Sequence, residues 1–225
     1  MIRKSHFFGI FEGKKGRHNL FLTKSLTNSK NKVYGEDLIR DGKDIYRTWD
    51  PSRSKLGAAL HKGVSQISIK PGSFVLYLGA ASGTTVSHIS DIVGHQGFVF
   101  ALDFAPRVLR ELYFLCEERK NMTPLFEDAN QPMNYADKIC EVDVVFQDIA
   151  QRNQVDIFIK NCKLFLKNGG FGLLALKARS VDVTKKPVEI FNMARKQLEK
   201  EMIIVDKRKL DPFEKDHILF VVKKK

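Results

Sequence analysis

The sequence predicts an α/β fold, a doubly wound and mostly parallel sheet preceded by a small β-rich N-terminal domain. Short apolar runs of strand length recur along residues 55–225, each followed by a segment with helical apolar spacing. Buried strands that alternate with amphipathic helices are typical of a parallel sheet covered on both faces. The pattern changes near residue 55 from short strands separated by breakers to alternating strands and helices, so we expect domains at residues 1–54 and 55–225.

The N-terminal segment contains short elements separated by breakers. Residues 5–11 and 19–23 have the composition of strands, Gly13 and Gly16 lie between them, and a polar stretch follows at 28–32. Glycine-bounded strands of this length predict a small antiparallel lobe.

The remaining elements follow in order from Ser54. Ser54 is a candidate N-cap of a helix, and Pro71-Gly72 marks a turn. Continuous apolar runs predict strands at 74–78, 98–102, 142–146, 171–176, 202–205 and 217–222. A further strand should end near Asp128. Helices are expected behind the first two runs and near 153–166 and 187–200, and the last two strands are expected to form a hairpin.

Composition limits the classes of protein. Hydrophobic residues make up 43% and charged residues 28% of the 225 residues, which is the globular range. No apolar run approaches the ~20 residues of a membrane span, and the start lacks the apolar stretch of a signal peptide, so we expect an intracellular protein without a membrane partner. The three cysteines are far apart, which predicts buried free thiols and neither a disulfide framework nor a metal site.

The charge is basic and unevenly distributed. The formal net charge is +12, and residues 1–70 contain 15 basic and 6 acidic residues. A surplus of this kind favours a polyanionic partner such as RNA, although a solvated basic surface would give the same count. The basic side chains of the N-terminal lobe are Arg3, Lys4, Lys14, Lys15, Arg17 and Lys24.

A small-residue loop at 79–85 joins the first long strand to its helix, which is where such sheets bind nucleotides. Its spacing is not Gly-x-Gly-x-x-Gly and no Gly-Lys-Ser/Thr follows, so a dinucleotide or phosphate loop fits poorly. Asp103 ends the second strand, where its carboxylate can accept hydrogen bonds from ribose hydroxyls. Phe104 can pack on adenine, and Asp128 and Ala129 can bind its amino edge. These residues favour S-adenosylmethionine and leave a nicotinamide cofactor as the alternative.

The loop and several other segments resemble the fibrillarin family. They are residues 46–56, 75–94, Asp143–Val145, Asp148–Gln151, Lys177–Ser180 and Asp216-His217. The resemblance implies a Rossmann-like class I methyltransferase sheet of seven strands and an RNA 2′-O-methyltransferase acting on pre-rRNA and tRNA. It also implies S-adenosylmethionine, a C/D-box guide RNA that selects the target, a Nop-domain scaffold protein and a kink-turn-binding protein.

The resemblance also implies the site residues. The cofactor contacts would be Gly79, Ala81, Thr84, Thr85, Asp103, Phe104, Asp128, Ala129, Asp148, Ile149, Ala150 and Gln151. Two positions depart from the family pattern: Asp103 stands where glutamate is usual, and Asn130 where a basic residue is common. Lys55, Asp148, Lys177 and His217 resemble the Lys-Asp-Lys-Glu tetrad of related enzymes, with histidine in the acidic position.

In this interpretation Lys177 orients the hydroxyl and helps to remove its proton, and a lysine with a lowered pKa would suit that role. Asp148 holds the lysines, Lys55 stabilises the developing alkoxide and His217 supports them. The chain has no glycine- and arginine-rich segment before its first strand, so we expect the compact archaeal form and a cytoplasmic location, against a nucleolar one in a eukaryote. A protein glutamine methyltransferase and a non-catalytic particle subunit stay open as alternatives.

Overall fold

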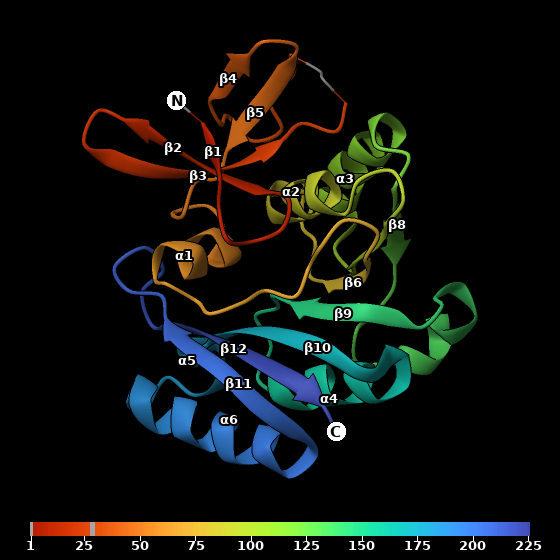
Figure 1. Ribbon diagram of the computed structural model, residues 1–225. Coiled ribbons are helices and arrows are strands. Elements are labelled where there is room, and N and C mark those ends of the chain that lie inside the picture. The colour runs from red at the N-terminus through yellow and green to blue at the C-terminus, as the bar shows by residue number, and fades with distance from the viewer. Residues whose placement is uncertain (1, 28–29) are drawn as a thin grey trace.

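The N-terminal strands form a sheet of their own in the computed structural model, which describes residues 2–27 and 30–225. In that part of the chain, five strands pair in the antiparallel order β1-β2-β3-β5-β4 (Figure 1). The strands are β1 (Arg3–Lys4), β2 (Ile10–Lys15), β3 (His18–Lys24), β4 (Leu38–Asp41) and β5 (Asp44–Thr48). The predicted strand at 19–23 is confirmed, and residues 28 and 29 of the polar stretch lie outside the described residues.

The predicted strand at 5–11 is wrong, because residues 5–9 form a turn between β1 and β2. The amide of Ser5 donates to the carbonyl of Ile10 at 3.1 Å, and the amide of Phe7 donates to the hydroxyl of Ser5 at 3.1 Å. Gly9 has a left-handed φ of 69°, and a Cβ at this position would lie 2.9 Å from Cγ2 of Ile92. A strand cannot continue through such a residue, and the turn packs the N-terminal sheet on the second domain.

The second sheet has seven strands in the described residues, in the order β11-β12-β10-β9-β6-β7-β8. They are β6 (Phe74–Leu78), β7 (Phe98–Asp103), β8 (Met122–Phe126), β9 (Val142–Gln147), β10 (Leu166–Lys177), β11 (Met202–Lys209) and β12 (His217–Lys224). The five strands from β10 to β8 run parallel, and β12 pairs antiparallel with both of its neighbours, β10 and β11. The predicted doubly wound sheet with a terminal hairpin is confirmed.

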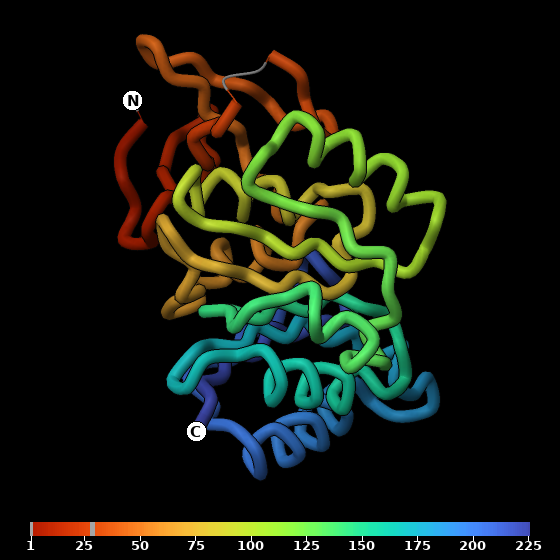
Figure 2. Tube along the Cα trace, turned by 90° about the vertical axis from the view of Figure 1, so that its right-hand side faces the viewer, coloured from red at the N-terminus to blue at the C-terminus, as the bar shows by residue number. Residues whose placement is uncertain are grey.

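Helices cover both faces of this sheet. The helices are α1 (Lys55–His61), α2 (Thr84–Val93), α3 (Pro106–Glu118), the 3₁₀ helix η1 (Pro132–Lys138), α4 (Gln154–Phe165), α5 (Ala178–Val181) and α6 (Pro187–Glu201). Helices α1, α2 and α3 lie on the side of the N-terminal sheet, and α4 and α6 lie on the other side (Figure 1). The two ends of the chain lie at opposite ends of the molecule (Figures 1 and 2).

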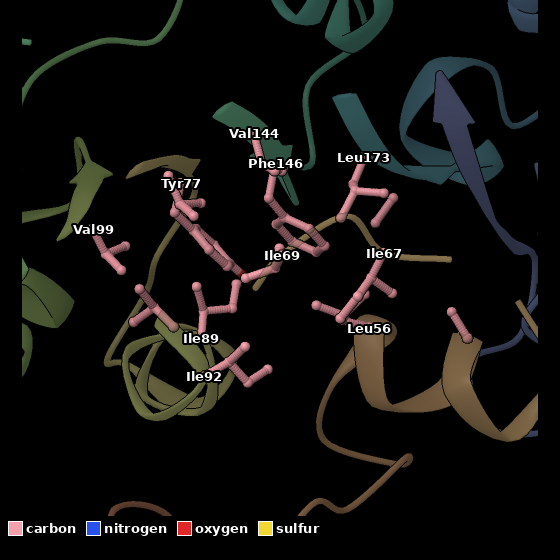
Figure 3. Close-up of a cluster of buried hydrophobic side chains, with 14 of the residues drawn as sticks. Leu56, Ile67, Ile69, Tyr77, Ile89, Ile92, Val99, Val144, Phe146 and Leu173 are labelled. Carbon is pink, nitrogen blue, oxygen red and sulfur yellow. The ribbon is translucent and has the colours of Figure 1, made fainter. Parts of the chain in front are cut away.

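Two apolar layers result, one on each face. Strand residues of one parity, such as Tyr77, Phe146 and Leu173, pack against α1 and α2 in the first layer (Figure 3). Residues of the opposite parity, such as Leu76 and Leu174, pack against α4 and α6 in the second. Side chains alternate between the faces of a strand, so each strand that is buried on both sides is a continuous apolar run.

A buried ionic network joins the N-terminal sheet to α2. Arg47 of β5 donates to Asp91 at 2.7 Å and to Glu36 at 2.8 Å, and Arg119 donates to the second oxygen of Asp91 at 2.7 Å. The side chains of Glu36 and Asp91 are 0% exposed. Buried charges of this kind are tolerated only when they are paired and hydrogen-bonded, so the network fixes the two sheets in one arrangement.

One expectation about the surface is wrong. Cys116 and Cys162 are buried as predicted, but Cys140 is exposed in the loop before β9. Among the six basic side chains of the N-terminal lobe, Arg3, Lys15 and Lys24 pair with carboxylates.

Within residues 2–27 and 30–225, no helix has both the length and the apolar character to cross a bilayer.

Candidate active site

Three neighbouring strands, β7, β6 and β9, end together at one edge of the sheet. The amide of Gly79 donates to the carbonyl of Leu102 at 2.9 Å, and the amide of Asp148 donates to the carbonyl of Leu78 at 2.9 Å. The chain leaves β6 between β7 on one side and β9 on the other. In open α/β sheets, ligands bind at the carboxyl ends of the strands at such a switch point.

The loop after β6 is shaped by glycines. Gly79 has a φ of 86°, and a Cβ there would lie 2.3 Å from the carbonyl oxygen of Asp148. Gly83 has a φ of 109° and caps α2, whose first residues are Thr84 and Thr85. Because Gly79 lacks a side chain, the loop lies directly on the backbone of Asp148, and the ends of β6 and β9 stay close together.

Asp103 ties this loop to the end of β7. One carboxylate oxygen accepts from the amide of Ala81 at 2.8 Å, and the other accepts from the amide of Ala105 at 2.9 Å. A carboxylate has about four acceptor positions, so both oxygens can still bind ribose hydroxyls. Asp103 therefore also organises the loop. Phe104 beside it is 59% exposed, so its ring face is open to a ligand.

Two further segments of the predicted cofactor site are joined by Asn130. Its side-chain amide donates to Oε1 of Gln151 at 2.8 Å, and its backbone amide donates to the carboxylate of Asp128 at 2.9 Å. Ala129 between them is buried, with 4% of its surface exposed. Asn130 thus holds the segment after β8 against the segment after β9.

Ser54 places Lys55 at the first position of α1. Its hydroxyl accepts from the amide of Gly57 at 3.1 Å, which confirms the predicted N-cap of α1. The same oxygen accepts from the indole of Trp49 at 2.9 Å and from the hydroxyl of Thr85 at 2.9 Å. The starts of α1 and α2 are therefore fixed to each other through one buried oxygen.

Lys55 forms an ion pair with Asp148 at 3.0 Å, where the two side chains are 24% and 21% exposed. Burial opposes the charge on Lys55, but the carboxylates of Asp148 and Glu214 raise its pKa above the ordinary value. Desolvation raises the pKa of Asp148, against the attraction of Lys55. Lys55 is therefore held as a cation, which suits the charge stabilisation predicted for it better than proton removal.

Lys177 and His217 lie side by side on adjacent strands. They are register partners in the antiparallel pair of β10 and β12. Lys177 is an even number of residues from Leu173 along β10, and His217 is an even number of residues from Leu219 along β12. Both leucines lie in the apolar layer beneath α1, so the side chains of Lys177 and His217 lie on the face of the sheet that carries Lys55. Lys177 is exposed, whereas His217 is 6% exposed. Both exert electrostatic effects on Asp148, so all four predicted tetrad members gather at this corner.

Glu214 is a member of this corner that the sequence interpretation missed. Its carboxylate lies 4.0 Å from Nδ1 of His217 and also acts electrostatically on Lys55. Glu214 comes three residues before His217, in a segment that ends with the Asp216-His217 resemblance, so Glu-x-x-His was the available signal. The corner therefore combines two cations, two carboxylates and an imidazole.

The residues at the strand ends fit S-adenosylmethionine better than a cofactor that carries phosphates. The glycine loop packs on the backbone of Asp148 at Gly79, so an acidic residue lies next to the loop. A carboxylate suits a positive sulfonium and would repel a phosphate. Asp103, Phe104 and Asp128 supply the acceptors and the open ring that a nucleoside requires.

Comparison with known proteins gives consistent matches over the whole chain. The family described as Fibrillarin matches residues 1–225. The "Fibrillarin-like rRNA/tRNA 2'-O-methyltransferase" of Thermococcus onnurineus is 49% identical over 225 residues, covering 99% of each chain. The structure of Aeropyrum pernix fibrillarin with natively bound S-adenosyl-L-methionine superposes with a TM-score of 0.91 at 38% identity, covering 99% of this chain and 97% of that one. Fibrillarin in a fibrillarin/Nop5p complex gives a TM-score of 0.88 at 37% identity, covering 99% and 100%.

Proposed function

This chain belongs to the fibrillarin family, and on that premise we propose that it is the catalytic subunit of a C/D-box guide RNA particle. It transfers a methyl group from S-adenosylmethionine to the 2′-hydroxyl of guide-selected riboses in rRNA and tRNA. The observation that carries the proposal is the corner where the Lys55–Asp148 ion pair meets Lys177 and His217 beside the glycine loop.

The cofactor would be held by the three segments that follow β6, β7 and β8. Asp103 would bind the ribose hydroxyls, Phe104 would cover the adenine, and the Asp128–Ala129 backbone would meet its amino edge. Thr84 and Thr85, with residues 148–151, would enclose the remainder of the molecule. When bound, S-adenosylmethionine supplies an electrophilic methyl carbon, whose bond to sulfur breaks with its electron pair left on sulfur as the 2′-oxygen bonds to the carbon.

The tetrad would prepare the hydroxyl for this reaction. A ribose hydroxyl is a weak acid, so neutral pH requires cations that stabilise its conjugate base and a group that accepts its proton. Lys55, held as a cation by Asp148, would stabilise the alkoxide. Lys177 would orient the hydroxyl from the end of β10 and assist the loss of its proton.

Target choice would be delegated to RNA. We infer a Nop-domain scaffold as the direct protein partner, supported by the relative solved in complex with Nop5p. A guide RNA would select the nucleotide by base pairing, and a kink-turn-binding protein would join through the scaffold. The exposed Lys4, Lys14 and Arg17 suit weak, salt-sensitive contacts with an RNA backbone.

Substitution of the tetrad tests the proposal. We expect Asp148→Ala or Lys177→Ala to reduce transfer of a tritiated methyl group to a guide-matched RNA by at least about 10²-fold in the assembled particle. Thermal unfolding should still show a folded protein. Lys70→Ala, which changes an exposed lysine outside this corner, is the control. Wild-type protein that binds S-adenosylmethionine but never methylates RNA, or tetrad variants with unchanged rates, would contradict the proposal.

A further inference from the structure

We propose that Nε2 of His217 accepts the proton of the ribose 2′-hydroxyl and that the carboxylate of Glu214 stabilises the imidazolium that forms. The inference rests on the proposed function and deepens it, because it names the base at the catalytic corner. It changes the interpretation of His217 from a supporting residue to a reacting one, and it adds Glu214, which the family resemblance did not supply.

The hydrogen bonds of His217 decide which ring nitrogen carries the proton. Nδ1 lies 2.7 Å from the backbone carbonyl of Lys215. A carbonyl oxygen can only accept, so Nδ1 must be the donor. In the neutral ring Nε2 is then without a proton, and its lone pair is free to accept one.

Nε2 is also open on its free side. Among residues 2–27 and 30–225, Nε2 has no hydrogen-bond partner. It is not one of the fully buried polar atoms that lack a partner, so it keeps some contact with solvent. The rest of the ring is buried, with 6% of the residue exposed. A buried ring with one accessible lone pair is the arrangement that a general base needs.

Charged groups from four elements face this ring. They are Lys55 at the start of α1, Asp148 after β9, Lys177 at the end of β10, and Glu214 in the loop before β12. Lys55 and Asp148 neutralise each other as an ion pair. The remaining Lys177 can stabilise the oxygen that loses its proton, and Glu214 can stabilise the imidazolium that forms. Burial, together with Lys55, lowers the pKa of His217, so the ring is a neutral acceptor at neutral pH.

Glu214 is held firmly enough for this role. Its Oε2 lies 4.0 Å from Nδ1, and its side chain is 19% exposed. The loop that carries it is fixed at both ends: the amide of Glu214 donates to the carbonyl of Leu210 at 3.1 Å, and Arg179 donates to Asp216 at 3.1 Å. The carbonyl of Lys215 therefore orients the ring through Nδ1, and the carboxylate of Glu214 can stabilise the protonated form electrostatically across 4.0 Å.

The proton balance is simple. The hydroxyl proton moves to Nε2 while the 2′-oxygen bonds to the methyl carbon and the carbon–sulfur bond breaks, leaving a 2′-O-methyl ribose, a neutral thioether and an imidazolium. Nε2 then releases its proton to water through its open side. No oxidant or further reactant is needed.

The first experiment is single-turnover methyl transfer by the reconstituted particle with His217→Gln. Glutamine cannot accept the proton, so we expect the rate to fall by about 10²–10⁴-fold while the affinities for S-adenosylmethionine and RNA stay unchanged. The exposed His95 provides the matched control His95→Gln. Circular dichroism and cofactor binding check the fold of each variant.

The second experiment is the pH dependence of the single-turnover rate. In wild type the rate should fall as the pH drops through the pKa of His217, which lies below the ordinary value of a histidine. This fall at low pH is the acid limb of the profile, and His217→Gln should lose it. Glu214→Gln removes a negative charge that favours the imidazolium, so the limb should move to lower pH by about one unit and the plateau rate should fall. Glu201→Gln, whose carboxylate pairs with Lys163, is the control.

The outcomes separate the two proposals. An inactive wild-type particle overturns the proposed function itself. An active wild type overturns only the present inference if His217→Gln keeps both its rate and its acid limb, or if Glu214→Gln leaves the limb where it was.

Discussion

Replacement of Gly79 by alanine tests whether the cofactor loop depends on its contact with Asp148. Gly79 has a φ of 86°, and an added Cβ would lie 2.3 Å from the carbonyl oxygen of Asp148 and 2.8 Å from Cγ2 of Ile149. The first contact is with backbone, so a rotamer change cannot relieve it. Gly79→Ala must therefore displace either the loop or the residue that pairs with Lys55.

The structure supplies a matched reference for the magnitude. Gly72 has a φ of 84°, and a Cβ there would meet nothing within 4 Å. Gly72→Ala should cost only the left-handed penalty of about 1–2 kcal/mol. Gly79→Ala should cost this amount plus about 1–3 kcal/mol for overpacking. A shift of about 1 Å at Asp148 should slow methyl transfer by about 10²-fold.

Urea denaturation of the two variants gives the difference in unfolding free energy, and isothermal titration gives the affinity for S-adenosylmethionine. We expect Gly79→Ala to bind at least about tenfold more weakly than wild type, which corresponds to about 1.4 kcal/mol, and Gly72→Ala to bind as wild type does. Equal unfolding free energies and equal cofactor affinities for the two variants would refute this account of the loop.

Two further predictions concern the contact between the sheets. Asp91→Ala leaves the buried guanidinium groups of Arg47 and Arg119 without a shared carboxylate. The unfolding free energy measured in urea should therefore fall by about 3–5 kcal/mol. A loss below about 1 kcal/mol would contradict the role of the network. Burial, with Arg47 and Arg119, holds the pKa of His88 well below its ordinary value. As the pH falls through about 6.5, His88 therefore becomes protonated in the unfolded chain but stays neutral in the folded chain. Below that pH the unfolding free energy should fall by up to about 1.4 kcal/mol per pH unit. Urea titrations at several pH values should show a shallower decline for His88→Gln than for His95→Gln, and parallel declines would contradict this.

Local patterns predicted most of the secondary structure. The strand at 74–78 and the N-cap at Ser54 were read correctly, because continuous apolar runs and cap spacing depend on neighbours within one turn or one strand. The strand predicted at 5–11 failed because Gly9 adopts a left-handed conformation that suits its packing on Ile92, a residue far away in the sequence. Cys140 was expected to be a buried free thiol, but it is exposed in the loop before β9, and the spacing of cysteines along a chain does not encode which loop residues face solvent.

The sequence by itself determined the order of strands and helices, the small-residue loop after the first long strand, and the identity of the four polar residues that resemble a catalytic tetrad. Only the tertiary structure decided how these residues act together. Lys55 and Asp148 are distant in sequence, and they meet because the order of the strands brings the end of β9 beside α1. The charge state of Lys55 and the contribution of Glu214 follow from burial and from distances across elements, which no periodicity along one strand or helix encodes.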